Sequence, residues 1–116
     1  MIIRRQQLEA LAAARKSQLA REIVSFLKEQ YNEARSAPEA ELLPPVQRLV
    51  RRAEYYGLNT EQDIAIYSIA GFMLGESFDI DFPAVQQVLP SPVLSSGEKA
   101  DWLLQWTTEL FQTLEK

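Results

Sequence analysis

A short turn from Gly57 to Thr60, followed by an apolar run from Ile64 to Leu74, most constrains how this chain can fold. Gly57 can adopt the left-handed backbone conformation that ends a helix without a Cβ clash. Thr60 and Asp63 have the spacing of a helix-starting cap. The run that follows is apolar on nearly every side, and such a helix must be surrounded by protein. The sequence therefore predicts a small domain built around this helix.

Helical periodicity extends through the rest of the chain, and no β-alternating segment of useful length is found. A long first helix is predicted from about Arg5 to Ala34, because apolar residues recur there at steps of three and four: Leu8, Leu11, Leu19, Ile23, Phe26, Leu27 and Tyr31. Further helices are expected at about residues 45–56, 61–76 and 97–114, the first of them starting at Pro45. One short helix is expected after Pro83.

Two local patterns refine these helices. Ser95 and Glu98 have the spacing of a capping box before the last helix. Gly71 and Gly75 leave room for a neighbouring helix, although Gly75 equally suits a helix end with unusual backbone angles. The fold class predicted for the 116 residues is all-α, a single-domain bundle of four main helices plus one short helix. Residues 1–35 are expected to form a long helix that projects from the core helices of residues 36–116.

Composition removes several kinds of chemistry. The chain has no cysteine, which excludes disulfides, thiolate metal sites and cysteine nucleophiles and suits a reducing compartment. It also has no histidine, the commonest general base and metal ligand. No phosphate-binding glycine loop or nucleophile motif is present. We therefore expect a protein that is not an enzyme and that has no catalytic residues, cofactor or metal ion.

The closest carboxylates follow the apolar helix. Glu76, Asp79 and Asp81 lack the further oxygen ligands and the central glycine of a calcium loop. We expect the aspartates to cap a turn and face water, while the alternating Phe78, Ile80 and Phe82 seal the loop onto the core. Similarly, Tyr55 and Tyr56 are interpreted as a helix end that packs on the core.

No membrane-spanning segment or secretory signal is predicted. No stretch approaches the roughly 20 apolar residues that cross a bilayer. The first residues lack the apolar segment and cleavage site of a signal peptide. A cytoplasmic location without membrane association is therefore expected.

Charge is divided unevenly along the chain. Residues 1–58 carry ten Lys and Arg against seven Asp and Glu, a net charge of +3, whereas residues 59–116 carry two against nine, a net charge of −7; together they give the total of −4. The two halves can attract each other within the fold, meet different partners, or simply be solvated.

A basic strip of Arg48, Arg51 and Arg52 lies on the predicted second helix and is a candidate partner-binding surface. The turn that follows is compatible with a helix-turn-helix. However, the helix after Thr60 is apolar and acidic, and no Lys or Arg occurs before Lys99. Such a helix cannot bind phosphates or read bases in the usual way, so nucleic-acid binding is not expected.

Trp102 and Trp106 lie one turn apart on the last helix. Tryptophan is enriched at protein interfaces, but ordinary core positions explain these residues equally well. Because Leu103 and Leu104 are expected to form a core stripe, at least one Trp should lie at its edge and is a candidate partner contact. The long amphipathic first helix suits a partner's groove or a second copy, so a homo-oligomer is also compatible with the sequence.

Three segments resemble a family of small helical proteins encoded in type VI secretion clusters, beside spike proteins, toxic effectors and effector-loading chaperones. They are Met1-Ile-Ile-Arg-Arg-Gln-Gln-Leu, Arg52-Ala-Glu-Tyr-Tyr-Gly-Leu-Asn-Thr-Glu-Gln-Asp-Ile and Met73-Leu-Gly-Glu-Ser-Phe-Asp-Ile-Asp. The second is similar to the family's arginine-alanine and tyrosine-glycine pairs, and the third to its glycine followed by Phe-Asp-x-Asp. The resemblance covers about residues 1–90 and does not include the helix with two Trp. Phe82-Pro83-Ala84 stands where the family often has Pro-Trp.

The resemblance implies a role in effector delivery and supplies no catalytic residues. The function predicted is a non-enzymatic adaptor or co-chaperone that binds a protein partner, namely an effector, a chaperone or a spike protein, during type VI loading. The alternative is an immunity protein whose acidic second half, with Glu76, Asp79 and Asp81, covers the basic active site of a toxin.

Overall fold

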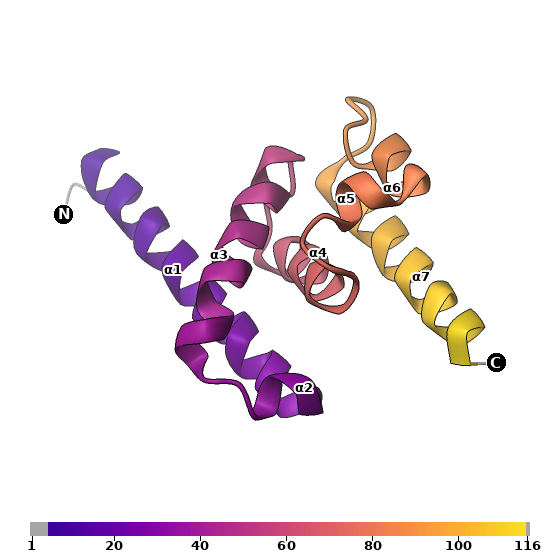
Figure 1. Cartoon of the computed structure of the whole chain (residues 1–116). Helices are drawn as coiled ribbons and strands as arrows, with labels where there is room; N and C mark the ends of the chain where they lie inside the picture. Colours follow the sequence, from indigo (N-terminus) through magenta and orange to yellow (C-terminus); the bar gives the residue numbers. More distant parts are fainter. Residues whose placement is uncertain (1–4, 116) are drawn as a thin grey trace. The chain divides into compact units, whose positions relative to one another are not determined.

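The computed structural model of the chain describes the backbone of residues 5–115 and the side chains of residues 18–113. Over these residues it is all-α, with seven helices and no strand (Figure 1). The long helices are α1 (Arg5–Gln30), α3 (Glu39–Tyr55), α4 (Glu61–Leu74) and α7 (Ser96–Glu115); the short ones are α2 (Asn32–Arg35), α5 (Phe78–Asp81) and α6 (Pro83–Val88). The predicted all-α class, the four main helices and the short helix after Pro83 are confirmed, whereas the short helices α2 and α5 were not predicted.

Contacts between Cα atoms group the chain into two compact units, residues 1–47 and 48–116, with the boundary inside α3. The predicted division into a projecting helix, residues 1–35, and core helices, residues 36–116, stays a prediction. Among the described residues, no helix combines the length and the apolar character needed to span a membrane.

In the first unit, α1 ends before the predicted position because Tyr31 adopts an extended conformation. Arg35 of α2 then turns back, and its guanidinium donates to the carbonyl oxygens of Lys28 and Glu29 at 3.4 and 3.1 Å. These carbonyls lack partners within α1, so Arg35 caps its end.

The predicted apolar stripe of α1 is confirmed in part. Leu19, Ile23 and Leu27 are buried, but Phe26 is 42% exposed. Leu8 and Leu11 lie outside the described side chains, and the segment from Met1 to Arg4 lies outside the described residues.

Helix α3 begins at Glu39, which corrects the predicted start at Pro45. Its first turn is held by the carbonyl of Pro38, which accepts from the amides of Glu41 and Leu42. Pro44 and Pro45 therefore lie inside the helix, near its start. Pro44 and Pro45 have no N–H donor, which is why the sequence placed the start of the helix there. The turn before the prolines, however, already has helical hydrogen bonds of its own.

The end of α3 is the glycine-terminated end that the sequence predicts. Gly57 has a φ of 85°. Its amide donates to the carbonyl of Glu54 at 2.9 Å, and the amide of Leu58 donates to that of Ala53 at 3.1 Å. This pair of bonds is the Schellman motif, and the buried Leu58 side chain closes it.

The start of α4 is also as predicted, and it is joined to α7. Thr60 Oγ1 accepts from the amide of Asp63 at 3.1 Å. The Asp63 carboxylate accepts from the hydroxyl of Ser96 at 2.6 Å, and the same hydroxyl accepts from the amide of Asn59 at 3.0 Å. The turn between α3 and α4 is thus bonded directly to the first residue of α7.

A capping box and a buried lysine complete the start of α7. Ser95 Oγ accepts from the Glu98 amide, and the Glu98 carboxylate accepts from the Ser95 amide, as the spacing predicts. Lys99 is 6% exposed, and its Nζ donates to the carbonyl of Tyr56 at 2.8 Å. A cation at the carboxyl end of α3 complements the helix dipole there.

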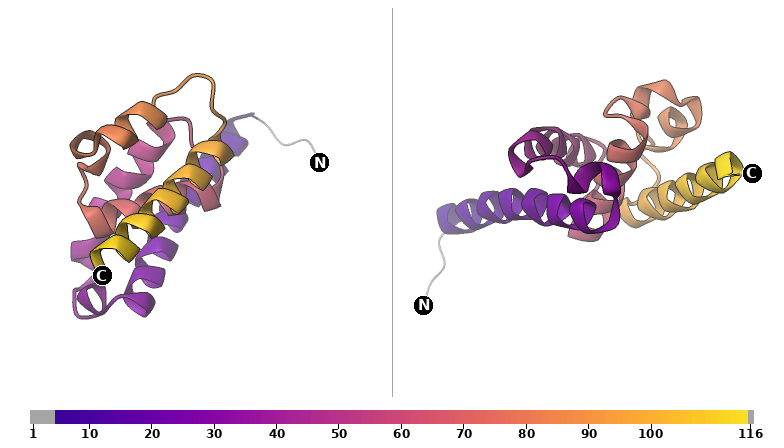
Figure 2. Two further views of the ribbon diagram at one scale, coloured as in Figure 1. Left: turned by 90° about the vertical axis from the view of Figure 1, so that its right-hand side faces the viewer. Right: turned by 60° about the horizontal axis from the view of Figure 1, so that its bottom comes forward.

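The second unit packs α4 against α7, and α5 and α6 lie next to each other beside α7 (Figures 1 and 2). Gly71 of α4 marks a close approach, because a Cβ there would overlap Cδ2 of Leu49 on α3. Gly75 instead ends α4 with a φ of 106° and has open space around it. Of the two explanations for these glycines, close approach holds for Gly71 and unusual backbone angles for Gly75.

The contact between Gly71 and Leu49 predicts a coupled pair of substitutions. Gly71→Ala alone should destabilise the fold by about 1 kcal/mol, because crowding against Leu49 exceeds the roughly 1 kcal/mol gained in helix propensity. In a Leu49→Ala background the crowding is absent, and Gly71→Ala should stabilise by about 1 kcal/mol. Urea unfolding of the four proteins measures both changes. The same effect of Gly71→Ala in both backgrounds would contradict the packing described.

Candidate protein-binding site

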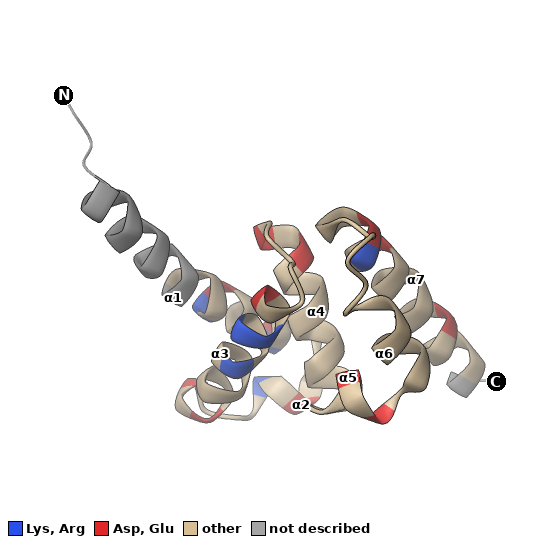
Figure 3. Ribbon diagram, turned by 90° about the horizontal axis from the view of Figure 1, so that it is seen from above, with Lys and Arg blue, Asp and Glu red and all other residues tan. Residues whose placement is uncertain are grey.

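The candidate site is built on the part of α3 that belongs to the second unit. Arg48, Arg51, Arg52 and Tyr55 are spaced three and four residues apart and therefore share one side of the helix. Figure 3 shows basic residues on α3 and acidic residues on α5. The basic strip predicted from the sequence is thus one surface of α3, and it faces the carboxylates of Glu76 and Asp79.

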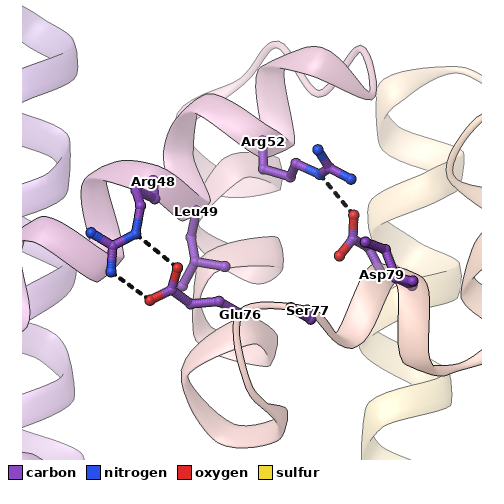
Figure 4. A pocket seen from close by; sticks show the side chains of 7 residues that line it. Arg48, Leu49, Arg52, Glu76, Ser77 and Asp79 are labelled. Atoms are coloured by element: carbon purple, nitrogen blue, oxygen red, sulfur yellow. Dashed lines mark hydrogen bonds and ion pairs between the residues drawn. The ribbon is translucent and has the colours of Figure 1, made fainter.

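Arg48 and Glu76 form a two-point ion pair. The Arg48 Nε donates to Glu76 Oε2 at 2.9 Å, and Nη2 donates to Oε1 at 2.7 Å (Figure 4). The hydrogen bonds from Arg48 lower the pKa of Glu76 and, in turn, raise the pKa of Arg48. Both side chains remain about half exposed, at 53% and 42%, so water has access to this pair.

Arg52 and Asp79 form a second ion pair in a different environment. Arg52 Nε donates to Asp79 Oδ2 at 2.7 Å, and the Tyr56 hydroxyl donates to the same oxygen at 2.6 Å. Asp79 is 2% exposed, so its charge depends on these two donors. The hydrogen bond to Asp79 raises the pKa of Arg52, and burial raises the pKa of Tyr56.

These pairs make the basic strip less positive than the sequence alone indicates. Two of its three arginines are neutralised by Glu76 and Asp79. Arg51 is exposed, and it has no hydrogen bond or ion pair among the residues that the structure describes.

Between the two ion pairs lies a depression of about 220 Å³ (Figure 4). Its lining residues come from α3, the α4–α5 connection and α5: Arg48, Leu49, Arg52, Glu76, Ser77, Asp79 and Ile80. Apolar and charged side chains thus share one small surface, which suits recognition of a mixed polar and apolar group.

Two apolar residues at this surface correct the sequence-based expectations. Tyr55 is 77% exposed and lies over the Arg52 guanidinium, 5.5 Å from its ring centroid, rather than packing on the core. Ile80 is 56% exposed, whereas Asp79 is buried, the reverse of what their alternation predicted. The spacing of Tyr55 four residues after Arg51 was the signal that placed it on the polar side of α3.

The tryptophans lie at the edge of the core, as predicted. Trp102 and Trp106 are half-buried and stack with ring centroids 5.6 Å apart. Trp106 also meets the ring of Phe82 edge-on at 5.2 Å. Leu103 is buried as expected, but Leu104 is 52% exposed and is not part of the core stripe. Much of the tryptophan surface therefore serves internal packing, away from the arginine surface.

Both acidic side chains of the site are engaged by arginines: Glu76 is bonded to Arg48, and Asp79 to Arg52. In the described part of the chain, no three acidic residues gather where they could hold a metal ion. Arg51, Tyr55 and Ile80 add an exposed cation, a phenol ring and an aliphatic side chain to the half-exposed pair of Arg48 and Glu76. Tyr and Arg are the residues most often responsible for binding energy at protein interfaces.

No protein-family model, curated protein or solved structure matches this chain.

One buried hydroxyl beside the site has no hydrogen-bond partner among the described residues. Tyr67 of α4 is fully buried, with its ring centroid 4.9 Å from that of Phe78, and its hydroxyl makes no hydrogen bond to any described residue. Burial, followed by the negative charge of Asp79, raises the pKa of Tyr67. The Tyr67 hydroxyl therefore lowers the free energy of unfolding, whereas the Tyr56 hydroxyl is satisfied by its hydrogen bond to Asp79.

Removing each hydroxyl should have opposite effects. Tyr67→Phe should stabilise the protein by about 1 kcal/mol, because it removes a buried donor without a partner. Tyr56→Phe should destabilise it by about 1 kcal/mol, because Asp79 loses a hydrogen bond. Urea unfolding at pH 7 compares the two variants. Destabilisation by Tyr67→Phe would mean that its hydroxyl has a partner.

The raised pKa values of Tyr56 and Tyr67 predict instability in alkali. Above about pH 10 the tyrosines of the unfolded chain lose protons, whereas Tyr56 and Tyr67 hold theirs to higher pH in the fold. The folded state then binds more protons, so the free energy of unfolding falls with pH, by up to about 1.4 kcal/mol per pH unit for each residue. Urea unfolding between pH 9 and 11 measures the slope. Tyr67→Phe should make it shallower, and an unchanged slope would contradict this account.

Proposed function

We propose that this protein is a non-enzymatic adaptor that binds a protein partner through the arginine surface of α3, and that it acts in the loading or delivery of a type VI secretion effector. The observation that carries the binding role is the exposed Tyr55 ring, ordered by Arg52 and accompanied by exposed Arg51 and Ile80. Aromatic and arginine side chains that are already held in place lose little entropy on binding.

The type VI setting rests on the resemblance of the segments that begin at Arg52 and Met73. Within that setting the partner is an effector, a chaperone or a spike protein, and the location is the cytoplasm. Trp102 and Trp106 are a second candidate contact, because each keeps part of its ring at the surface. Their internal contacts make them less suitable for a test, since alanine there would also remove packing.

The immunity alternative has less support from the geometry. It requires Glu76, Asp79 and Asp81 to meet a toxin's basic site. Glu76 and Asp79 are instead bonded to Arg48 and Arg52, which leaves Asp81 as the exposed carboxylate of the three without an arginine partner among the described residues. The two functions differ in phenotype: an immunity protein rescues cells that express its toxin, whereas an adaptor is required for the toxin's export.

Capture of the tagged protein from its source organism tests the proposal. The wild type should co-purify a spike protein, chaperone or effector, and Tyr55→Ala should reduce the recovered amount at least about tenfold, as expected for an interface hot spot. Leu104→Ala is the matched control, because Leu104 is an exposed apolar residue on α7. Equal recovery by all three proteins would exclude the arginine surface. If the wild type recovers none of these proteins, the adaptor function is excluded.

A further inference from the structure

We infer that Glu76 is an internal substitute for a partner's carboxylate: the depression between α3 and α5 accepts an acidic segment of the partner, whose carboxylate replaces Glu76 on Arg48. This inference rests on the proposed adaptor function and specifies the chemistry of its partner.

The first step is the contrast between the two ion pairs. Arg52 is committed to Asp79, because releasing a carboxylate that is 2% exposed would leave a buried charge unpaired. Arg48 is not committed in this way, because Glu76 is 42% exposed and can be hydrated when it leaves. Exchange of one carboxylate for another at Arg48 therefore carries little penalty.

The second step is the geometry of Arg48. Its Nε and Nη2 already present two parallel donors to a carboxylate at 2.9 and 2.7 Å. This fork is the arrangement by which arginine recognises a carboxylate, and Glu76 holds it in place before a partner arrives. An incoming Asp or Glu side chain would meet a preorganised site.

The third step is the freedom of Glu76 to withdraw. It follows Gly75, which has a φ of 106° and no atom within contact distance of an added Cβ. Glu76 lies in the connection between α4 and α5, outside both helices. Its side chain can therefore leave the depression without moving either helix.

The last step is the surroundings of the fork. Leu49 and Ile80 line the same depression, and Ser77 adds a hydroxyl. Arg51, which shares its side of α3, offers a second cation. The lining therefore fits a segment that carries more than one acidic residue and an apolar residue between or beside them.

Fluorescence anisotropy with a defined probe tests the inference. The probe is a labelled, terminally blocked peptide with Glu-Leu-Glu at its centre and Gly-Ser flanks, and the control peptide carries Gln-Leu-Gln. Wild-type protein should bind the first and not the second. Glu76→Gln should bind roughly three-fold tighter, since the internal competitor is gone, and Arg48→Gln about ten-fold weaker.

Two matched variants separate this mechanism from a general charge effect. Glu109→Gln removes an exposed carboxylate on α7, and Arg21→Gln removes an exposed cation on α1. Both should bind like the wild type. The inference is wrong if Glu76→Gln binds no tighter than Glu109→Gln, if Arg48→Gln binds as well as Arg21→Gln, or if the wild type does not bind the probe. Circular dichroism checks that each variant is folded.

The peptide-binding test of this inference and the capture test of the proposed function can fail independently of each other. If the partner is captured through Tyr55 but the peptide results fail, the adaptor function stands and exchange at Arg48 is overturned. If the peptide results hold but none of the type VI proteins is captured, the acid-binding depression stands and its assignment to effector delivery falls.

Discussion

The buried charge of Asp79 is the constraint on which this part of the molecule depends. A carboxylate that is 2% exposed must be paired, and Arg52 and Tyr56 on α3 supply both donors to it. Helix α5 has only four residues, too few to be stable by themselves. Its position is therefore fixed from outside, by this ion pair and by the fully buried Phe78. The depression and the exposed Ile80 exist because α5 is held against α3.

Sequence reasoning succeeded where the hydrogen bonds are local. The caps at Thr60 and Ser95 and the glycine at the end of α3 connect residues only a few positions apart, so their spacing specifies the bonds. The ion pairs of the candidate site join residues 27 and 28 positions apart. A single sequence holds no signal for which distant charges meet, so the arginines were identified as a strip while their carboxylate partners were not.

In the segment Phe78 to Phe82, buried and exposed residues were predicted the wrong way round because the sequence was read with the two-residue period of a strand. Read with a period of two, the aromatic and aliphatic residues share one face and the aspartates the other. The segment is instead a helical turn, in which residues four positions apart share a face. Phe78 and Phe82 are accordingly buried or half-buried, and Phe82 meets Trp106. Asp79 then turns inward toward Arg52, and Ile80 turns outward to the candidate site.

The same geometry separates the residues that fix α5 against α3 from those that carry the proposed binding site. Arg52, Tyr56 and Asp79 bind one another, while Gly57 and Gly75 have the positive φ angles that end α3 and α4. These residues hold α5 against α3 and end the two long helices that precede it. Tyr55 and Ile80 are instead exposed at the surface of this frame. Changes at such exposed positions would alter a binding interface without disturbing the buried ion pair, so the partner could change while the frame is kept.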